Sequence, residues 1–252
     1  MNPVSLTSLK NPNVLLWRSL KERKARLEHS LFLVEGDKSV GEAMASTFPI
    51  EALLLREDRS VPSGLPEALP VYLLPDHVFS AVCDTKTPQG IAAVVAMRPQ
   101  RPSGSRWIAL NGVQDPGNVG TILRTADAAG FTGVLLDREC ADVFSPKVLR
   151  ATMGSIFRIG LDFPSSLPLA LRELREKGWS VISSQLDGTP FYSREAVADS
   201  FVLIVGSEGS GVSAAVAAEA THHLRLPMRG GAESLNAAVA AGIMMYDLTR
   251  GD

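Results

Sequence analysis

The chain has 252 residues, which is enough for one large domain or two of ordinary size with a substantial buried core. Hydrophobic residues make up 45% of the sequence and charged residues 21%, the balance of an ordinary soluble globular protein. The formal net charge of −2 excludes a surface that is positive throughout, so contacts with nucleic acid have to come from local basic patches.

The cysteines and the N-terminus indicate the cellular compartment. The two cysteines, Cys83 and Cys140, are far apart and fit no metal-ligand spacing, so we expect reduced thiols, as in the cytosol. The N-terminal stretch MNPVSLTSLKNPNVLLW lacks the uninterrupted apolar run of a signal peptide. No segment reaches the roughly 20 apolar residues that cross a bilayer. We therefore expect a soluble cytoplasmic protein without a membrane segment.

Short apolar runs alternate with helical patterns in the first 96 residues. Strands are predicted at LFLVEG, EALLLRE, VYLLP and GIAAVVAM, and helices around 14–27, 38–46 and 75–82. This alternation predicts a small α/β domain over residues 1–96. The following stretch MRPQRPSGSR, residues 97–106, is rich in Pro, Gly and Ser and is predicted to be a linker.

From residue 107 to residue 252 the alternation is more regular. Strands are predicted at WIALNGV, GVLLD, WSVISSQ, FVLIVG and HLRLPM, and helices at NVGTILRTADAAG, SPKVLRATMGS, LPLALRELREKG, VSAAVAAEA and SLNAAVAAGIMMYDLTR. Strands that are apolar throughout and alternate with helices predict a second α/β domain, built on a parallel sheet covered on both faces.

Polar or glycine-rich clusters follow three of these strands, at NGVQDPGNVGTILRTADAAG, FVLIVGSEGSGVS and LPMRGGAESLN. Open parallel sheets bind ligands at this edge, because loops and helix N-termini meet there. In the second cluster Gly209, Gly211 and Ala214 match the loose dinucleotide pattern G-x-G-x-x-A. That pattern belongs to the first βα turn of its fold, and no acidic residue closes a following strand about 20 residues later. A nucleotide-dependent oxidoreductase is therefore disfavoured.

Each polar residue of the clusters also has a purely structural explanation. Ser234 could cap a helix, with Glu233 near its positive end. Arg124 could be a solvated side chain and Glu208 a turn residue. Asn236 is harder to explain, because Asn is a poor choice inside an otherwise apolar helix. The structural explanation requires all of these at once, so a ligand site is favoured.

Taken together, the three clusters resemble the three motifs of the SpoU family of RNA 2′-O-ribose methyltransferases, within the SPOUT superfamily. The first motif is an Asn followed six residues later by an Arg, matched by Asn118 and Arg124. The second is matched by VGSEGSG and the third by LPMRGGAESLN, and SPKVLRATMGSIF resembles the second helix of the family. KERKARLEHSLFLVEGDKSVGEAM and DTKTPQGIAAVV resemble its small ribosomal-protein-like α/β substrate-binding domain.

This resemblance implies a deep trefoil knot near the C-terminus, S-adenosylmethionine as methyl donor without a metal, and a homodimer whose active site is shared between subunits. The implied cofactor-binding residues are Gly206, Gly211, Leu226, Met228 and Leu235. The implied catalytic residues are Arg124, Asn118, Glu208, Ser234 and Asn236. A guanidinium stays protonated and is a poor base, so we expect Arg124 to bind the adjacent RNA phosphate and stabilise the developing alkoxide. The other four would hold Arg124 and the ribose by hydrogen bonds.

Positive charge is concentrated near the N-terminus and in the linker. The residues predicted to bind RNA are Arg18, Lys21, Arg23, Lys24 and Arg26, and the linker adds Arg98, Arg101 and Arg106. Such contacts would position the RNA backbone without reading its sequence. The predicted function is S-adenosylmethionine-dependent 2′-O-methylation of a ribose in structured RNA, with ribosomal RNA preferred over transfer RNA. The alternative is a non-catalytic RNA-binding or ribosome-assembly protein on the same fold.

Overall fold

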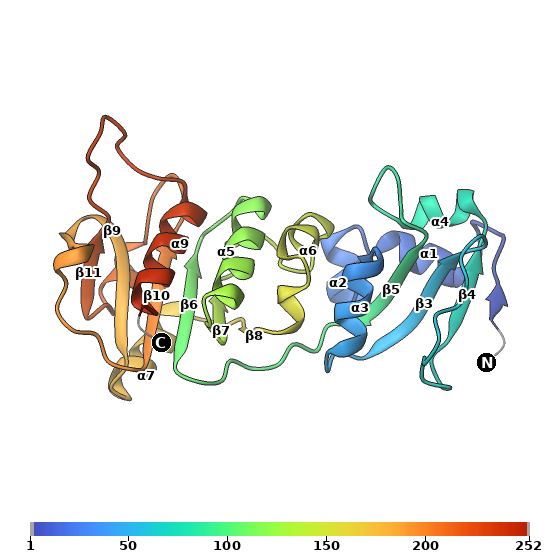
Figure 1. The fold of residues 1–252 in the computed structure, drawn as a ribbon, viewed down its shortest axis with the longest axis horizontal. Coiled ribbons are helices and arrows are strands. Elements are labelled where there is room, and N and C mark those ends of the chain that lie inside the picture. Colours follow the sequence, from blue (N-terminus) through green and yellow to red (C-terminus); the bar gives the residue numbers. More distant parts are fainter. Residues whose placement is uncertain (1–2, 251–252) are drawn as a thin grey trace. The chain divides into compact units, whose positions relative to one another are not determined.

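The computed structural model describes residues 3–250. The chain forms two compact units, one of residues 3–99 and 144–157, the other of residues 100–143 and 158–250 (Figure 1). No helix among these described residues has the length and apolar character needed to cross a membrane.

The first unit is built on a mixed five-stranded sheet in the order β1-β4-β3-β5-β2. Its strands are β1 (Val4–Ser5), β2 (Leu31–Glu35), β3 (Ile50–Arg56), β4 (Val71–Leu74) and β5 (Ile91–Ala96). Its helices are α1 (Pro12–Ser19), α2 (Arg23–His29), α3 (Asp37–Ala45) and α4 (Asp76–Val82). β5 runs antiparallel to both of its neighbours, β3 and β2. Trp17 from α1 and Phe79 from α4 are buried in a core on one face of this sheet.

The helix predicted over residues 14–27 is interrupted. α1 ends at the C-cap Leu20, and α2 begins after the N-cap Glu22. The intervening turn leaves the carbonyls of Leu20 and Lys21 without helical partners, and the guanidinium of Arg26 binds both. A polar partner far along the second helix therefore stabilises a break that the hydrophobic pattern does not show.

Residues 144–157, which the predicted boundary at residue 107 assigns to the second domain, pack with the first unit. They form α6 (Pro146–Thr152) and the short 3₁₀ helix η1 (Ser155–Phe157). The ring of Phe32 lies 4.8 Å from that of Phe144 and 6.2 Å from that of Phe157, between ring centroids. Arg150 also pairs with Asp84 at 2.7 Å. An aromatic cluster thus attaches this segment to β2.

The second unit contains a six-stranded sheet in the order β11-β9-β10-β6-β7-β8, and all of its pairings are parallel. Its strands are β6 (Arg106–Asn111), β7 (Gly133–Leu136), β8 (Gly160–Asp162), β9 (Ser180–Pro190), β10 (Phe201–Gly206) and β11 (His222–Arg225). Its helices are α5 (Pro116–Ala128), α7 (Leu167–Glu176), the 3₁₀ helix η2 (Phe191–Ser193), α8 (Ala214–Ala217) and α9 (Ala237–Leu248).

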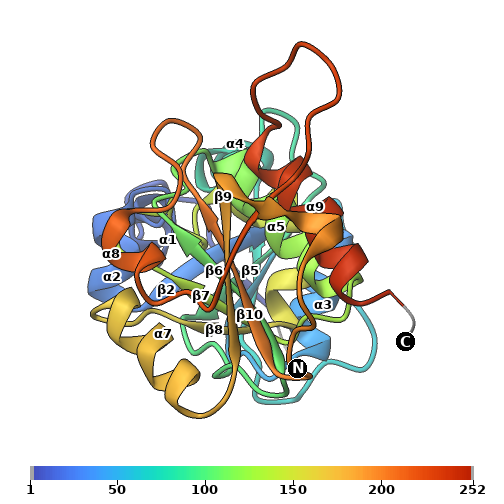
Figure 2. The same ribbon diagram turned by 90° about the vertical axis from the view of Figure 1, so that its left-hand side faces the viewer.

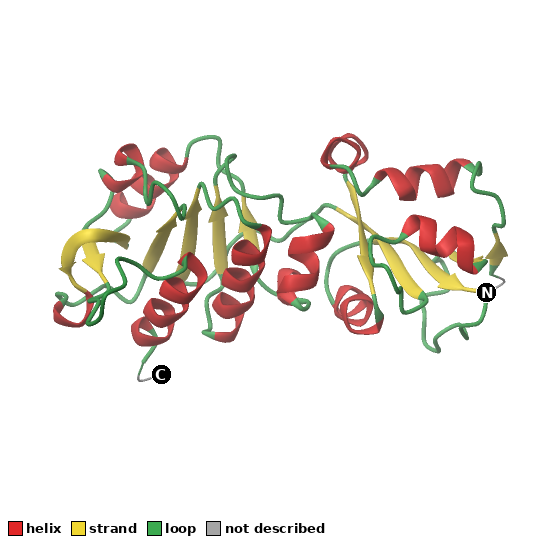
Figure 3. Cartoon of the chain, turned by 90° about the horizontal axis from the view of Figure 1, so that it is seen from above, coloured by secondary structure: helices red, strands yellow, loops and turns green. Residues whose placement is uncertain are grey.

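Helices cover both faces of the parallel sheet, as predicted. α7 and α8 lie on one face, and α5 and α9 pack together on the other (Figures 2 and 3). Leu171 and Leu174 of α7 share a buried core with Val181 and Val202 of the sheet. This arrangement places the loops after β6, β9 and β10 at one edge of the sheet, where ligands bind in such folds.

The end of the predicted linker packs on the second unit. The amide of Leu161 donates to the Gln100 carbonyl at 2.8 Å, and that of Phe201 donates to Ser105 at 2.8 Å. A Cβ at Gly160 would lie 2.6 Å from the Arg101 carbonyl oxygen, so only glycine fits beneath this segment. Residues 100–105 are therefore an ordered border of the sheet.

Candidate active site

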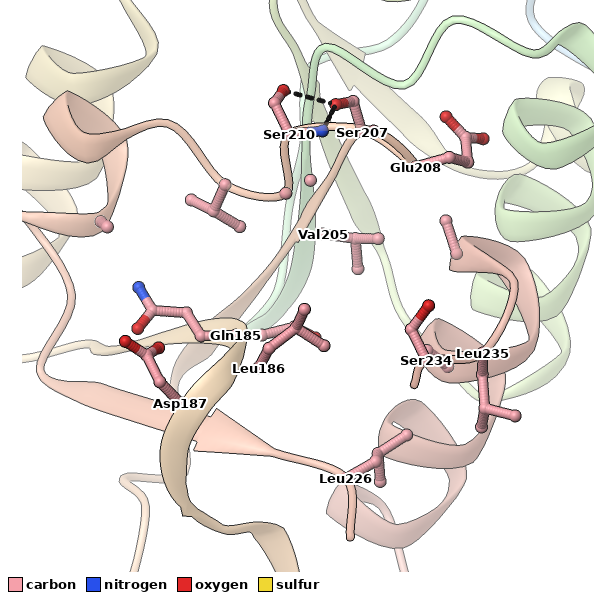
Figure 4. A pocket seen from close by; sticks show the side chains of 18 of the residues that line it. Gln185, Leu186, Asp187, Val205, Ser207, Glu208, Ser210, Leu226, Ser234 and Leu235 are labelled. Carbon is pink, nitrogen blue, oxygen red and sulfur yellow. Dashed lines mark hydrogen bonds between the residues drawn. The ribbon is translucent and has the colours of Figure 1, made fainter. Parts of the chain in front are cut away.

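A cavity of about 680 Å³ opens at the carboxyl edge of the parallel sheet (Figure 4). Its walls come from the end of β9, the loop after β10, the chain after β11 and the start of α9. All five residues expected to bind a cofactor line it: Gly206, Gly211, Leu226, Met228 and Leu235. Residues from two separate segments, 206–211 and 226–235, are thus brought to one surface.

A tight glycine turn forms one wall of this cavity. The backbones of Ser207 and Gly211 exchange two hydrogen bonds, of 3.1 and 3.0 Å, and Gly211 has a φ of +66°. A Cβ at Gly206 would lie only 2.0 Å from the carbonyl carbon of Gly211. The turn closes only if residue 206 has no side chain, and it leaves backbone groups at the cavity surface.

The charges on the cavity wall are of one sign. Asp187 and Glu208 are the acidic residues that line it, and its lining within the described chain includes no Lys, Arg or His. Apolar side chains such as Val205 and Leu226 supply much of the remaining surface. A cavity with two carboxylates and no cation favours a positively charged ligand with an apolar body, and disfavours a polyphosphate.

Three polar side chains form a hydrogen-bonded chain beside the cavity. The amide of Asn118 donates to Oε1 of Glu208, and its Oδ1 accepts from Nδ2 of Asn236 at 2.9 Å. Oδ1 of Asn236 accepts from the amides of Ala238 and Val239 at 2.9 and 3.2 Å. Because a carboxylate can only accept, this order fixes which way both asparagine amides face.

The start of α9 corrects one prediction. The helix begins at Ala237 with Asn236 as its N-cap, so Asn236 is not inside the helix and Ser234 does not cap it. Capping explains why Asn is tolerated there. Ser234 instead lines the cavity, on the side opposite Asp187 (Figure 4).

Arg124 takes no part in the hydrogen-bonded chain of Glu208, Asn118 and Asn236. It is exposed on α5, six residues after Asn118 and so about 9 Å farther along the axis. Among residues 3–250, no side chain forms a hydrogen bond or ion pair with Arg124. The expectation that the other four polar residues hold it is not met within one chain, and its guanidinium is left available.

The residues predicted to bind RNA divide into two groups. Arg26 is only 3% exposed and donates to the carbonyls of Leu20 and Lys21, both at 2.7 Å, so its prediction as an RNA contact is wrong. Lys21 is half-buried, and its Nζ donates to the Ala81 carbonyl at 2.9 Å. Arg18, Arg23 and Lys24 are exposed.

Asn111 supports the cavity although sequence reasoning gave it no role. It is 8% exposed at the end of β6, where it donates to Oδ2 of Asp137 at 2.6 Å and accepts from the Ser213 amide at 2.7 Å. The ends of β6 and β7 and the start of α8 are thereby joined. The signal was an Asn closing an apolar strand, just before Gly112.

The cysteines take no part in chemistry at this edge. Burial raises the pKa of the Cys140 thiol to about 12, and the neighbouring Asp137 carboxylate acts in the same direction. Burial also raises the pKa of Cys83. Both thiols are buried and have a raised pKa, so neither has the accessible thiolate that a nucleophile requires.

Comparison with protein families decides the membership of the chain. Residues 105–246 match the model of the SpoU rRNA Methylase family, and residues 11–93 match the MRM3-like substrate binding domain. The chain belongs to the SpoU family. The matched range contains the whole cavity and the Glu208–Asn118–Asn236 chain.

Similar proteins cover nearly the full length of this SpoU protein. The Bacillus subtilis 23S rRNA (guanosine(2553)-2′-O)-methyltransferase RlmP is 41% identical over 244 residues, which are 96% of this chain and 98% of RlmP. A structure from Porphyromonas gingivalis, described as of the TrmH family, has a TM-score of 0.88 and 37% identity, covering 97% of this chain and all of that one. An AdoMet-bound rRNA methyltransferase from Sinorhizobium meliloti has a TM-score of 0.87 and 32% identity, with 98% and 97% coverage.

Proposed function

We propose that this protein transfers a methyl group from S-adenosylmethionine to the 2′-hydroxyl of a ribose in structured RNA, ribosomal RNA above all. The observation that carries the proposal is the cavity whose wall includes Glu208, the first member of the Glu208–Asn118–Asn236 chain. The similarity to RlmP, a 23S rRNA 2′-O-methyltransferase by name, supports both the reaction and the class of RNA.

The cavity fits S-adenosylmethionine. Its volume of about 680 Å³ is in the range of small-molecule sites. Its two carboxylates suit a ligand that carries a sulfonium and an ammonium, and the glycine turn, which closes because Gly206 has no Cβ, presents backbone groups to that ligand. Gly206, Gly211, Leu226, Met228 and Leu235 would hold the cofactor, which when bound supplies an electrophilic methyl group. The AdoMet-bound relative from Sinorhizobium meliloti supports this choice.

The chain of Glu208, Asn118 and Asn236 would hold the ribose, and Arg124 would bind the RNA backbone. Methyl transfer requires the hydroxyl oxygen, the methyl carbon and the sulfur to lie in line, so fixed groups must hold the ribose. Asn118 and Asn236, whose amide orientations are set, provide such groups. Arg124 has no partner among the described residues and can bind an RNA phosphate through its planar fork. The proton then leaves to phosphate or water, because a guanidinium does not accept it.

A second copy of the chain completes the proposed enzyme. α9 is apolar except for Asp247 near its C-terminal end, and it leaves Val239, Ile243 and Tyr246 exposed at 51%, 37% and 56%. Their spacing of four and three residues places them on one helix face, next to α5 and its Arg124. A homodimer through this face would bring a partner surface to Arg124. Gel filtration with light scattering should give two chains, and one chain for Ile243→Glu.

The proposal also covers the residues that bind RNA, the trefoil knot and the cellular location. The exposed Arg18, Arg23 and Lys24 of α1 and α2 would bind RNA phosphates. The trefoil knot implied by the family remains a prediction for the segment after β10. The cytoplasm, where ribosomal RNA is modified, is the proposed location.

The test is transfer of labelled methyl groups from S-adenosylmethionine to ribosomal RNA from cells that lack the protein. The wild type should label one alkali-resistant dinucleotide. Arg124→Ala should lose at least about 100-fold in rate with unchanged cofactor affinity, and Arg124→Lys should recover little, because an ammonium lacks the bidentate fork. If the wild type binds both ligands and transfers nothing, the non-catalytic RNA-binding alternative replaces this proposal.

A further inference from the structure

Strand β9 leaves the regular sheet at the cavity. It pairs with β10 only as far as Ser183, and its register with β11 jumps between Ser183, opposite His223, and Thr189, opposite Leu224. Residues 184–188 therefore have no partner on β11 and form a large bulge. A Cβ at Gly188 would lie 2.4 Å from the His223 carbonyl oxygen, so the strand rejoins β11 only because residue 188 is glycine.

The bulge brings a carboxylate to the cavity. Gln185, Leu186 and Asp187 line it, and Figure 4 shows the polar ends of Gln185 and Asp187 close together, on the side opposite Ser234 and Leu235. Nε2 of Gln185 donates to the Ser183 hydroxyl at 3.2 Å. Asp187 is exposed, and no described residue forms a hydrogen bond or ion pair with its side chain.

The two carboxylates of the cavity are not equivalent. Glu208 is engaged by the Asn118 amide and belongs to the polar chain. Asp187 has free acceptor oxygens and lies in β9 beyond Ser183, the last residue that pairs with β10, the strand that leads into the glycine turn. In dinucleotide-binding folds, an acid on the strand beside the glycine-turn strand accepts hydrogen bonds from ribose hydroxyls, and Asp187 of β9 likewise lies beside the glycine-turn strand β10.

We infer that Asp187 binds the ribose hydroxyls of the cofactor. The inference rests on the proposed function, and it gives this chain an acidic ribose contact on β9, the strand that precedes the glycine turn. Two vicinal hydroxyls can each donate a hydrogen bond, and the two oxygens of one carboxylate can accept both. The glycine turn then contacts the cofactor through backbone groups, and the polar chain is left to the RNA.

Binding of S-adenosylhomocysteine and of its 2′-deoxy and 3′-deoxy analogues, measured by titration calorimetry, tests this. The wild type should bind at least one deoxy analogue roughly 10- to 100-fold more weakly, the range for a hydrogen bond to a charged group. Asp187→Ala should weaken the binding of S-adenosylhomocysteine by a similar factor, and this variant should bind all three ligands with similar affinity. Asp199→Ala, which removes an exposed carboxylate outside the cavity, should behave as the wild type.

Three other outcomes have distinct meanings. If Asp187→Ala still discriminates against the deoxy analogues, the hydroxyls are bound elsewhere and the inference is wrong. If Asp187→Ala loses affinity for S-adenosylhomocysteine but not for 5′-methylthioadenosine, which keeps the ribose and lacks the amino group, the carboxylate binds the ammonium instead. If the folded wild type does not bind S-adenosylhomocysteine, the proposed function itself fails.

Discussion

In the second unit, Asn118 and Asn236 are 118 positions apart in sequence and bind each other. In the first unit, the residues predicted to bind RNA all lie within residues 18–26 and do not form one site. One of those cations, Arg26, is buried against backbone carbonyls. Polar residues from several strand ends that converge on one cavity are strong evidence of a site. A run of charged residues along one short segment is weak evidence of a binding site, because any of them can instead form hydrogen bonds to nearby backbone carbonyls.

A side chain added to the glycine turn tests whether the cavity of the second unit is a binding site. We expect Gly206→Ala to abolish cofactor binding and methyl transfer, because its Cβ would overlap the Gly211 carbonyl and force the turn open. Gly209→Ala is the matched control. It lies in the same turn, a Cβ there meets nothing within 4 Å, and its φ is not in the left-handed region.

Titration calorimetry with S-adenosylhomocysteine measures this effect. A Gly206→Ala protein that binds within about threefold of the wild type would show that the turn does not form the cofactor wall. Loss of binding in both variants would point to a general sensitivity of the loop rather than to the space at residue 206.

A second experiment separates the buried cation from the exposed ones. Arg26→Ala should lower the free energy of unfolding of the first unit by about 2–4 kcal/mol, because it leaves the Leu20 and Lys21 carbonyls without their donor and a cavity in their place. Arg23→Ala and Lys24→Ala, on the exposed surface, should change stability by less than about 0.5 kcal/mol. Urea unfolding followed by tryptophan fluorescence provides the comparison.

RNA binding should reverse that order. Each of Arg23→Ala and Lys24→Ala should weaken RNA binding and lower the slope of log K against log salt by about one, as expected for the loss of one phosphate contact. If both variants bind RNA with the wild-type slope, the exposed face of α2 is only solvated. Arg26→Ala should keep the slope under conditions in which it stays folded.

Much of the second unit follows from its sequence pattern. Continuous apolar strands alternating with helices predict the parallel sheet, and that sheet places polar strand ends at one edge. Apolar periodicity does not predict an element whose position is set by contacts with a distant part of the chain. β8 (Gly160–Asp162) has only three residues, too few for a pattern, and is positioned by the Arg101–Pro102 segment that packs on Gly160.

The site itself was only partly predictable. Gly206 and Glu208 lie in one motif, and their neighbourhood follows from local sequence. The place of Asp187 depends on a bulge, which only the pairing of β9 with β11 creates. Likewise, Asn236 appeared to lie inside a helix because Ser234 is itself a suitable N-cap, whereas the hydrogen bonds of Asn236 to two backbone amides start the helix there. Long-range pairing and side-chain capping are not encoded in apolar periodicity.

The smallest expected effect concerns a buried carboxylate in the second unit, which is the counterpart of Arg26 in the first and pairs with two far more exposed arginines. Glu219, which follows α8, is 5% exposed, and Arg172 and Arg175 of α7 bind its carboxylate at 2.5 and 3.1 Å. The hydrogen bond from Arg172 holds the pKa of Glu219 below its ordinary value of 4.5. The folded state therefore binds this proton less readily than the unfolded state. The stability that follows is complete above the ordinary pKa and is lost as the pH falls through the lowered one.

Unfolding of the wild type and of Glu219→Gln by urea, from pH 7 down to pH 3, measures this contribution. We expect the difference in unfolding free energy to be constant above about pH 5 and to shrink below it, because the side-chain amide of the Glu219→Gln variant cannot titrate. A difference that stays constant to pH 3 would mean that Glu219 acts through packing alone. Arg172→Gln should give the same pH dependence, since it removes the partner that lowers the pKa. Agreement between the two variants would establish that, as with Arg26, a charge inside the fold serves the backbone framework rather than the substrate.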